Sequence, residues 1–447
     1  MENSPTHPQD AAARYAFIIH PLKTSMIANH RLFWWVKYIP EWFVEWVAVR
    51  YPPVFAGKVK GVLSPANGKR ADGYLIALGG TPRALMSRPP EAIYRQLIRA
   101  GQMAHKKGCQ IMGLGAFTSV IGDAGVTVAQ QSHIAITTGN SLTVAATLET
   151  ARAALIAMGA QPEELPNLRA MVVGATGSIG SACARTLAPI VPHLVLVAPR
   201  EEKLRALQDT ILTESPFAQV DVSTVPDEYL SQMDLIITAT SAVGHVTVNI
   251  SQCKPGAVIC DIARPPDISP EEAALRPDVL VIESGEIILP GEVEVTIDIG
   301  LPPGVVYACL AETVLLALED RFENYTLGRE IDLARVKEID ALYHKHGCRL
   351  SAFRSHGQFL TDEDIAEKRT LAAALRQDKG RLARLQQQAA ALQVIRQTTP
   401  VVTTPRRPHY EWIGLGFSVA AAVLTGFLLW RRKQESGPPG GGGSCAE

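Results

Sequence analysis

Three glycines follow a short apolar segment near the middle of the chain, and they limit what this region can fold into. Residues 168–173 (LRAMVV) predict a buried strand, Gly174, Gly177 and Gly180 follow it directly, and a helical pattern begins at once afterwards. In this order the first glycine permits a tight turn, the second lets the backbone approach a phosphate, and the third lets the helix pack against the strand. We therefore predict a Rossmann-type, doubly wound dinucleotide-binding domain over residues 166–300, although the spacing is GxxGxxG rather than GxGxxG.

The next predicted strand, residues 193–198, ends just before Arg200, where a site for NAD usually has an acidic residue. A guanidinium suits a 2′-phosphate and Lys203 can assist it, so we predict NADPH as the cofactor, with a solvated loop charge as the plain alternative for Arg200. Later strands place Thr238 and Ser241 at carboxyl ends, where such sheets bind ligands. The predicted cofactor-binding residues are Gly174, Ala175, Thr176, Gly177, Ser178, Ile179, Gly180, Arg200, Lys203, Thr238 and Ser241.

Residues 56–165 predict a separate α/β substrate domain ahead of the nucleotide fold. Two strand-like stretches flank Asn67-Gly68, a strong hairpin turn. An amphipathic helix over 90–107, a β-like run that leads into a small-residue loop over 111–119, and an Ala-rich helix over 142–159 follow. Such alternation is typical of an α/β domain.

Cys309 lies about 130 residues beyond the glycine run, in the segment 301–358, which we predict to be helical. A thiol can take an acyl group from a carrier, and a bound nicotinamide can deliver hydride to the same carbonyl, so the pairing suggests thioester reduction. Thr118, Ser119, Thr138 and Asn140 are polar residues of Gly-rich loops that suit oxyanion donors, or else turns and caps. The predicted catalytic residues are Cys309, Thr118, Ser119 and Asn140. From residue type alone, a cysteine such as Cys309 is more often a buried helical residue than a nucleophile, and Glu312 is only a polar helix position.

Composition excludes several classes of protein. The chain has 447 residues, of which 47% are hydrophobic, and this is enough for two or three packed domains. Its formal net charge of −1 includes no basic excess that would follow a phosphate backbone, so nucleic acid is not an expected partner. The seven cysteines form no CxxC pair, which favours reduced thiols in a cytosol over a disulfide framework or a zinc site, and we predict no metal.

The C-terminal part predicts membrane attachment. Residues 412–430 (WIGLGFSVAAAVLTGFLLW) carry no charge and are long enough to span a bilayer with a tryptophan at each interface, so we predict a single-pass anchor rather than a buried core helix. The flanking basic residues are balanced and do not decide its orientation, but a cytosolic cofactor places the catalytic part in the cytoplasm. Ahead of the anchor we predict a stalk helix over 361–398, with heptad spacing typical of weak pairing into a homo-oligomer, and a Pro-rich spacer over 399–411. A disordered Gly/Pro-rich tail over 431–447 follows the anchor.

A second lipid-like feature lies in residues 1–55, which we expect to be an aromatic, amphipathic N-terminal extension. Residues 32–47 hold four of the six tryptophans, and Lys37, Pro40 and Glu41 interrupt the run. It is therefore too polar to span a membrane, and we predict an interfacial or lid helix pair, or else an ordinary aromatic core helix.

Five segments of the chain, in order, resemble the long-chain acyl-[acyl-carrier-protein] reductases of cyanobacteria. They are residues 113–119 (GLGAFTS), 137–140 (TTGN), 173–181 (VGATGSIGS), 307–312 (YACLAE) and 324–329 (NYTLGR). The similarity runs from about residue 45 to 350, and it implies NADPH-dependent reduction of a fatty acyl thioester, on acyl carrier protein or acyl-CoA, to a fatty aldehyde. It also implies an acyl intermediate on the cysteine that matches Cys309. The aromatic extension, the stalk and the anchor depart from the family.

Two other functions remain open on the sequence alone. A shikimate- or amino-acid-type NADP-dependent dehydrogenase shares the arrangement of an α/β domain before a GxxGxxG domain, but that chemistry usually has a Lys-Asp pair, and none is convincing near residues 137–140. A membrane-tethered, NADP-binding protein without catalysis is the third alternative.

Overall fold

The structure is a computed structural model of the chain, and it describes residues 12–21, 24–28, 34–240, 248–263 and 266–398. Within these ranges no helix is both long and apolar enough to cross a membrane. The predicted spacer, anchor and tail over 399–447 lie outside the described residues, and so does Ser241. The described residues belong to one compact unit that ends at Arg396, except for the last two residues of the terminal helix.

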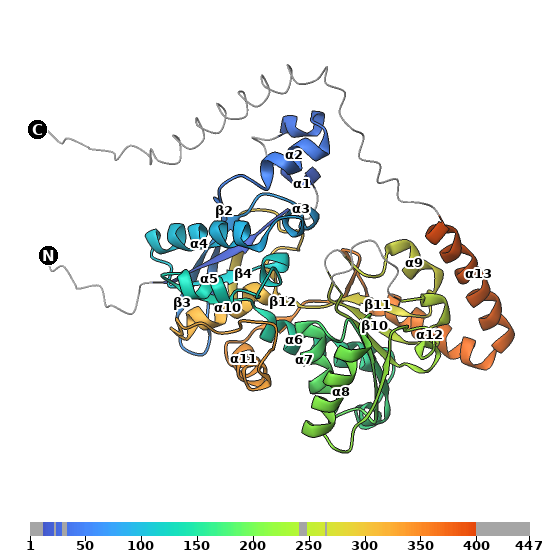
Figure 1. Ribbon diagram of the computed structural model, residues 1–447. Coiled ribbons are helices and arrows are strands. Elements are labelled where there is room, and N and C mark those ends of the chain that lie inside the picture. Colours follow the sequence, from blue (N-terminus) through green and yellow to red (C-terminus); the bar gives the residue numbers. More distant parts are fainter. Residues whose placement is uncertain (1–11, 22–23, 29–33, 241–247, 264–265, 399–447) are drawn as a thin grey trace, which may run out of the picture. The chain divides into compact units, whose positions relative to one another are not determined.

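The N-terminal sheet has six strands in the order β13-β2-β3-β1-β4-β5 (Figure 1). Their bounds are β1 (Ala13–Ile19), β2 (Val54–Leu63), β3 (Arg70–Ala77), β4 (Ile111–Leu114), β5 (Ala135–Thr137) and β13 (Gly291–Val295). The predicted hairpin is confirmed, because β2 and β3 pair antiparallel around Gly68. Strands β3, β1, β4 and β5 are parallel, so their carboxyl ends share one edge of the sheet.

Residues 13–19, which we expected to be part of an N-terminal extension, form the strand β1 inside the N-terminal sheet. Tyr15 and Phe17 pack into one hydrophobic core, whereas Ala16 and Ile18 pack into the other. A parallel strand that is buried on both faces shows no alternation of polar and apolar residues, so periodicity does not reveal it. The substrate domain therefore begins far ahead of residue 56.

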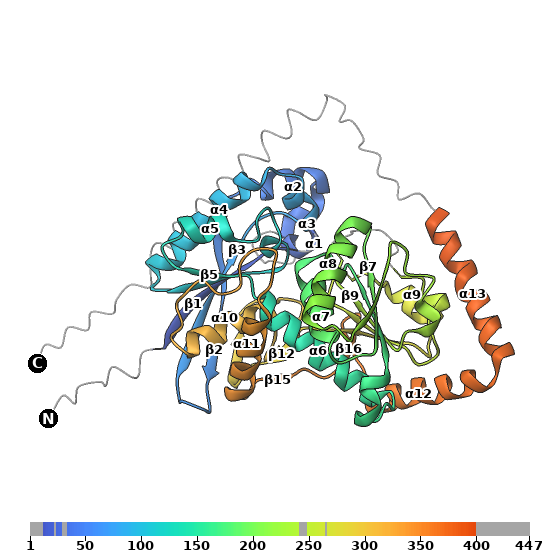
Figure 2. The same cartoon turned by 60° about the horizontal axis from the view of Figure 1, so that its bottom comes forward.

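Helices cover both faces of this sheet (Figure 2). The core with Ala16 and Ile18 includes residues of α3 (Pro82–Met86), α4 (Pro90–Lys106) and α5 (Val126–Gln131). The core with Tyr15 and Phe17 includes residues of α6 (Asn140–Ala157), α10 (Ala308–Leu318) and α11 (Leu333–Lys345). The predicted helices at 90–107 and 142–159 correspond to α4 and α6.

The second sheet confirms the Rossmann-type prediction. Its six strands are all parallel, in the order β11-β10-β9-β6-β7-β8. Their bounds are β6 (Arg169–Val173), β7 (His193–Val197), β8 (Gln219–Ser223), β9 (Leu235–Thr238), β10 (Val258–Asp261) and β11 (Leu280–Glu283), with helices α7 (Ser178–Leu187), α8 (Glu201–Glu214) and α9 (Pro270–Leu275). The chain reverses its direction of winding between β6 and β9, which is the switch point where such sheets bind ligands.

The segment 301–358 is only partly helical. Ahead of α10 the chain forms β14 (Val305–Tyr307), which pairs with β12 (Glu286–Ile288), and β12 also pairs with β15 (Arg349–Leu350). A two-residue pairing of β16 (Arg354–Ser355) with β17 (Gln358–Phe359) follows. These short strands position the start of α10.

The stalk, predicted as one helix over residues 361–398, consists of two helices. They are α12 (Asp362–Gln377) and α13 (Lys379–Thr398), with a break at Asp378. Arg376 of α12 donates to the Pro255 carbonyl at 2.9 Å and Lys368 donates to the Pro277 carbonyl at 3.2 Å. Because α12 is tied to the nucleotide-binding domain, only α13 retains the character of a stalk.

A fully buried ion pair supports the nucleotide-binding domain. Arg276 and Asp278 are both inaccessible, and the guanidinium meets the carboxylate at 2.7 and 2.8 Å. The other end of the guanidinium donates to the carbonyls of Ile250, Ser251 and Cys253. Such a pair is destabilising when one partner is removed, because the remaining charge stays buried.

We expect Asp278→Ala to lower the free energy of unfolding by about 3–5 kcal/mol, because it leaves the Arg276 charge without its carboxylate. Glu201→Ala is the control: it removes an exposed ion pair to Arg205 on α8, and its effect should stay below about 1 kcal/mol. Urea denaturation of both variants checks this. Equal losses would show that the buried pair contributes no more than the exposed one.

Candidate active site at the carboxyl ends of the strands

Cys309 lies in the first turn of α10. Tyr307 precedes this helix as its N-cap, and the Ala308 N–H donates to the Gly285 carbonyl at 2.8 Å. Among the six cysteines of the described ranges, Cys309 alone is partly exposed. Burial raises the pKa of the other thiols, to about 12 for Cys109, Cys183, Cys253 and Cys348. Cys309 is therefore the accessible thiol of this part of the chain, at a helix end that favours negative charge.

The start of α6 packs directly on this cysteine. Gly139 caps α6 with a φ of 74°, and a Cβ added there would lie 2.2 Å from the Cys309 Cα and 2.6 Å from its carbonyl oxygen. Any side chain at Gly139 would therefore displace Cys309 or the start of α6. Because Gly139 follows β5, this contact places the thiol at the carboxyl edge of the N-terminal sheet.

Two buried polar atoms flank Gly139 without hydrogen-bond partners in the described structure. They are the side-chain hydroxyl oxygen of Thr138 and the amide nitrogen Nδ2 of Asn140, and both residues are buried. Buried polar groups are usually paired, so these two atoms are available to a ligand, as are the other unpaired atoms of the described core. Asn140 keeps its predicted role as a candidate donor, whereas the Thr138 side chain faces Gly125, since its Cγ2 lies 3.6 Å from a Cβ built there.

Thr118 and Ser119 have a different setting. Both are buried in the 3₁₀ turn η3 (Ala116–Ser119) that follows β4. The Thr118 hydroxyl donates to the Gly115 carbonyl at 2.7 Å, so its proton closes a turn and is not available to a substrate. Of the two readings of the sequence, this contact favours a turn residue for Thr118.

Glu312 joins the elements around Cys309, although the sequence suggested only helix polarity for it. Its fully buried carboxylate accepts hydrogen bonds from the Thr137 hydroxyl, from the Thr326 hydroxyl at 2.9 Å and from the Leu142 N–H at 2.9 Å. Burial raises the pKa of Glu312, and the donors partly offset that rise. The carboxylate thus ties α10 to the end of β5 and to the first turn of α6. A lone acidic residue in the apolar helix ACLAETVLLAL was the signal that identifies it.

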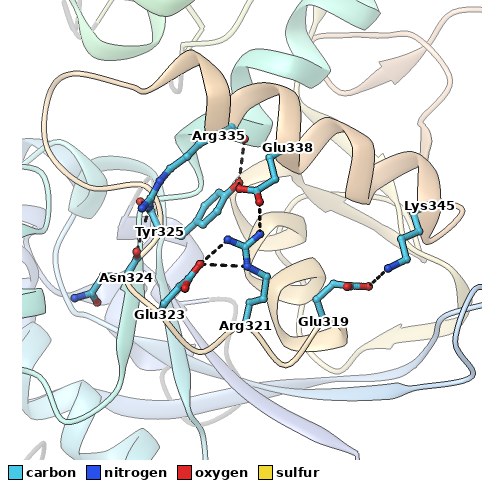
Figure 3. Close-up of polar contacts among 8 residues, drawn as sticks. All are labelled: Glu319, Arg321, Glu323, Asn324, Tyr325, Arg335, Glu338 and Lys345. Atoms are coloured by element: carbon cyan, nitrogen blue, oxygen red, sulfur yellow. Dashed lines mark hydrogen bonds and ion pairs between the residues drawn. The ribbon is translucent and has the colours of Figure 1, made fainter.

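Ion pairs and hydrogen bonds between α11 and the segment after α10 hold that segment in place (Figure 3). Arg321 pairs with Glu323 at 2.5 Å and with Glu338 at 2.7 Å, and the Tyr325 hydroxyl donates to Glu338 at 2.8 Å. Burial acts to raise the pKa of Glu338, but the hydrogen bonds from Arg321 and Tyr325 lower it overall. Lys345 forms a further ion pair with Glu319 in the same view.

This segment then lies beside β5. The Tyr325 N–H donates to the Ile136 carbonyl at 3.1 Å, and the Thr138 N–H donates to the Thr326 carbonyl at 2.9 Å. The network on α11 therefore fixes Thr326, and Thr326 in turn fixes Glu312 and Thr138. We assign the network a positioning role: it orients the residues of the candidate site and is not proposed to contact a ligand.

His20 is a residue of this edge that the sequence did not indicate. It follows β1, and its Nε2 accepts from the Phe117 N–H at 3.3 Å while Nδ1 lies 3.3 Å from the Pro21 carbonyl. Burial lowers the pKa of His20, which keeps the ring neutral with its proton on Nδ1. No pattern in the sequence around residues 13–21 distinguishes this histidine.

The glycine run has the geometry of a phosphate cradle. Gly174 has a φ of 82°, and its Cβ would lie 2.6 Å from the Ala239 carbonyl oxygen across the switch point. A Cβ at Gly180 would lie 2.4 Å from the Gly174 carbonyl oxygen, so the helix is as close to the strand as expected. Gly177 is exposed and caps α7, and Ala175, Thr176, Ser178 and Ile179 complete the turn at the start of this helix, an end that suits a phosphate. These features fit a dinucleotide, and cofactor contacts stay a prediction.

The remaining predicted cofactor residues differ in their availability. Arg200 caps α8 directly after β7, and its exposed side chain pairs with no residue in the described ranges; the Lys203 side chain is likewise exposed and unpaired there. Thr238 is buried, and its hydroxyl donates to Asp261 at 3.0 Å, so it supports the loop after β10. Arg200 is thus free to meet a phosphate, whereas the Thr238 hydroxyl is already used.

The carboxyl ends of both sheets reach Cys309. Gly139 follows β5 in one sheet, and Gly285 follows β11 in the other and accepts from the Ala308 N–H. Because β11 is parallel to β6, its carboxyl end lies at the same edge as Gly174. The thiol therefore stands where the ligand-binding edges of the two sheets adjoin.

One group of metal-ligand type lies elsewhere in the described ranges, although the sequence predicts no metal. Glu149 of α6 and Asp340 and His344 of α11 bring ligand atoms within 4.8 Å of one another. They lie along the packing of α6 on α11, away from the first turn that contacts Cys309.

Known proteins are similar to different parts of this chain. The family model of shikimate / quinate 5-dehydrogenase matches residues 157–283. The aminotransferase PigE of a Serratia species is 34% identical over 260 residues, which make up 56% of this chain and 29% of that protein. The long-chain acyl-[acyl-carrier-protein] reductase of Synechococcus elongatus is 25% identical over 311 residues, or 66% of this chain and 87% of that protein. Among solved structures, a 5-ketofructose reductase of a Gluconobacter species matches 74% of this chain and 99% of its own, with 14% identity and a TM-score of 0.34.

These findings define the class of protein. Residues 157–283, which match the family model, hold the six parallel strands of a Rossmann-type nucleotide-binding domain. The chain is distantly related to the acyl-[acyl-carrier-protein] reductase and nearer in sequence to PigE. It spans less than a third of the length of PigE.

Gly139→Ala tests the contact with Cys309, and Gly68→Ala is a matched control. Both glycines have positive φ, so each alanine costs about 1–2 kcal/mol in backbone strain, but a Cβ at Gly68 meets nothing within 4 Å. We expect Gly139→Ala to lose about 1–3 kcal/mol more than Gly68→Ala through the clash. Urea unfolding measures this, and equal losses in the two variants would contradict the contact.

Proposed function

We propose that the protein is an NADPH-dependent reductase that converts long-chain fatty acyl thioesters to fatty aldehydes through an acyl group on Cys309. The observation that carries the proposal is the partly exposed Cys309 at the start of α10, which packs against Gly139. The next residue after Gly139, Asn140, has an unpaired amide nitrogen. The distant similarity to an acyl-[acyl-carrier-protein] reductase supports the choice of substrate class.

The first step is an exchange of thiols. The Cys309 thiolate attacks the carbonyl carbon of the acyl-CoA or acyl-carrier thioester, a new C–S bond forms, and the bond to the carrier sulfur breaks as the carrier thiolate leaves. The attacking and leaving sulfurs have similar basicity, so the step needs a thiolate and a donor to the carbonyl oxygen rather than a strong acid. The Asn140 amide, next to Gly139, is the candidate donor.

The cradle of the glycine turn and the unpaired guanidinium of Arg200 support NADPH as the cofactor. When bound, NADPH supplies the hydride that brings the acyl carbon to the aldehyde level. The role of Cys309 is to hold the acyl carbon through the reduction and then to leave as a thiolate when the C–S bond breaks.

A shikimate-type dehydrogenase is less well supported by the site. The matching family model covers residues 157–283 and includes neither Cys309 nor the N-terminal sheet. No lysine occurs in the described strand ends of that sheet, at residues 20–21, 78–81, 115–119 and 137–140. The pair of Lys69 with Asp320 lies at the amino end of β3, opposite the site.

The membrane attachment belongs to the same proposal. We infer that residues 412–430 form a single-pass C-terminal anchor that holds the catalytic part at the cytoplasmic face, and that α13 allows weak pairing between copies. Hydrophobicity of the run supports the anchor, and the insolubility of fatty aldehydes gives such an anchor a purpose.

Incubation with palmitoyl-CoA tests the acyl intermediate by intact-protein mass. The wild type should gain one palmitoyl group, which disappears on addition of NADPH as aldehyde forms, because the enzyme thioester is then reduced. Cys309→Ala should show neither adduct nor aldehyde, whereas the control Cys348→Ala, at a buried cysteine, should keep both. Aldehyde formation at the wild-type rate in Cys309→Ala would remove the thiol from the mechanism.

Arg200→Ala tests the choice of cofactor. Loss of a charge-assisted contact to the 2′-phosphate should raise the KM for NADPH by about tenfold or more, and leave the KM for NADH unchanged. Arg205→Ala, which removes another exposed arginine of α8, is the control and should change neither value. Steady-state kinetics with both cofactors decide the matter, and an equal rise for NADH would sink the 2′-phosphate assignment.

A further inference from the structure

Large aromatic side chains gather on the surface of residues 34–48. Tyr38, Trp42 and Trp46 are 73%, 59% and 53% exposed, and we call them the aromatic face. Tyr38 ends the 3₁₀ helix η2 (Trp34–Tyr38), and the two tryptophans are one turn apart on α2 (Glu41–Ala48). Folded proteins seldom leave several tryptophans in water, and when they do the patch usually binds something.

The acidic and basic side chains around the aromatic face have different partners. The acidic groups of α2 are held by the protein, since Glu45 accepts from the Thr81 hydroxyl and Glu41 from the Thr24 hydroxyl, each at 2.5 Å. The cations instead lie over the aromatic rings: the Arg50 guanidinium is 4.5 Å from the centre of the Trp46 ring. Lys37 lies 5.0 Å from that of Tyr38. The face therefore presents rings and cations outward.

The position of α2 connects this face with the candidate site. A Cβ at Gly79, which follows β3, would lie 1.9 Å from the Ala48 carbonyl oxygen, and Gln96 donates to the Val49 carbonyl at 3.0 Å. The end of α2 is thus docked at the carboxyl end of β3. Gly139, which packs against Cys309, lies at this same edge of the N-terminal sheet.

We propose that the aromatic face rests in the interfacial layer of a lipid bilayer. Tryptophan and tyrosine prefer that layer, where the ring lies among acyl chains and the polar group meets water. The helix α2 has 8 residues and two carboxylates, so it lies on a membrane rather than crossing it. We commit to a lipid bilayer as the occupant, because the anchor proposed for the uncharged run 412–430 would hold the same chain at a membrane.

This inference deepens the proposed function and rests on it for its purpose. A face in the bilayer beside the edge that carries Cys309 lets a long acyl chain enter, and an insoluble aldehyde leave, without crossing water. The docking itself requires no catalysis. It can therefore be tested separately from the reaction.

Photo-crosslinking in the full chain identifies the occupant. Trp42 or Trp46 is replaced by p-benzoyl-phenylalanine, the protein is reconstituted in phosphatidylcholine vesicles, and adducts are mapped by mass spectrometry after irradiation. The control carries the same group in place of Phe217, which is fully exposed between α8 and β8. We expect lipid adducts at residues 42 and 46 at about tenfold the yield at residue 217, since an anchored chain brings every surface near lipid but only a docked face into it.

Three results would overturn the proposal. Equal lipid yields at all three positions would show proximity without docking. A covalent dimer would identify a second copy as the occupant, and an adduct to another segment of the same chain would identify that segment. The same crosslinks repeated in Cys309→Ala separate the two proposals: lipid adducts there, with aldehyde formation intact, would leave the docking standing and remove the cysteine mechanism.

A double variant checks the consequence for substrate. Trp42→Ala with Trp46→Ala removes exposed side chains, so the unfolding midpoint should stay near that of the wild type. The KM for palmitoyl-CoA in vesicles should rise by about tenfold, while the KM for a short, water-soluble acyl-CoA stays unchanged. A double variant with the wild-type KM for both substrates would refute a role of the face in substrate entry.

Discussion

The candidate site depends on one buried carboxylate. Glu312 lies one turn beyond Cys309 on an otherwise apolar helix, and it meets donors from Thr137, Leu142 and Thr326. A carboxylate in such a place is destabilising unless every lone pair is used, so these donors must stay where they are. The end of β5, the first turn of α6 and the segment after α10 are therefore fixed relative to the thiol. Rigid placement of this kind is what a transfer between two sulfurs requires.

The same region explains why the two sheets cooperate. Parallel strands leave free backbone groups at their carboxyl ends, and here the carboxyl ends of β5 and β11 meet at the start of α10 through Gly139 and Gly285. One end carries Asn140 next to Gly139, and the sheet of the other carries the glycine turn that suits a dinucleotide. Under the proposed function, substrate and cofactor would approach one carbonyl from the two sheets.

Much of the fold could be predicted from the sequence, because its signals are local. The second sheet was identified by apolar runs and by glycines whose roles depend on neighbouring residues. Strand β1 was not, since a strand buried on both faces lacks alternation. Thr118 and Thr138 illustrate the limit at the site: both lie in Gly-rich loops, and only the fold shows that one hydroxyl is spent on Gly115 while the other is unpaired. Glu312 likewise acquires its meaning from partners up to 175 residues away.

The similarity to shikimate-type dehydrogenases ends at residue 283, and this boundary has a physical meaning. The matched part is the nucleotide fold, whose turn and switch point are required by any dinucleotide. The residues that follow include Gly285, β12, β14 and α10, and α10 carries Cys309 and the buried Glu312. The element to which the proposed function assigns the chemistry therefore follows the matched domain rather than lying within it. A match to that domain identifies the cofactor class alone, and the choice of substrate has to be argued from the segment around Cys309.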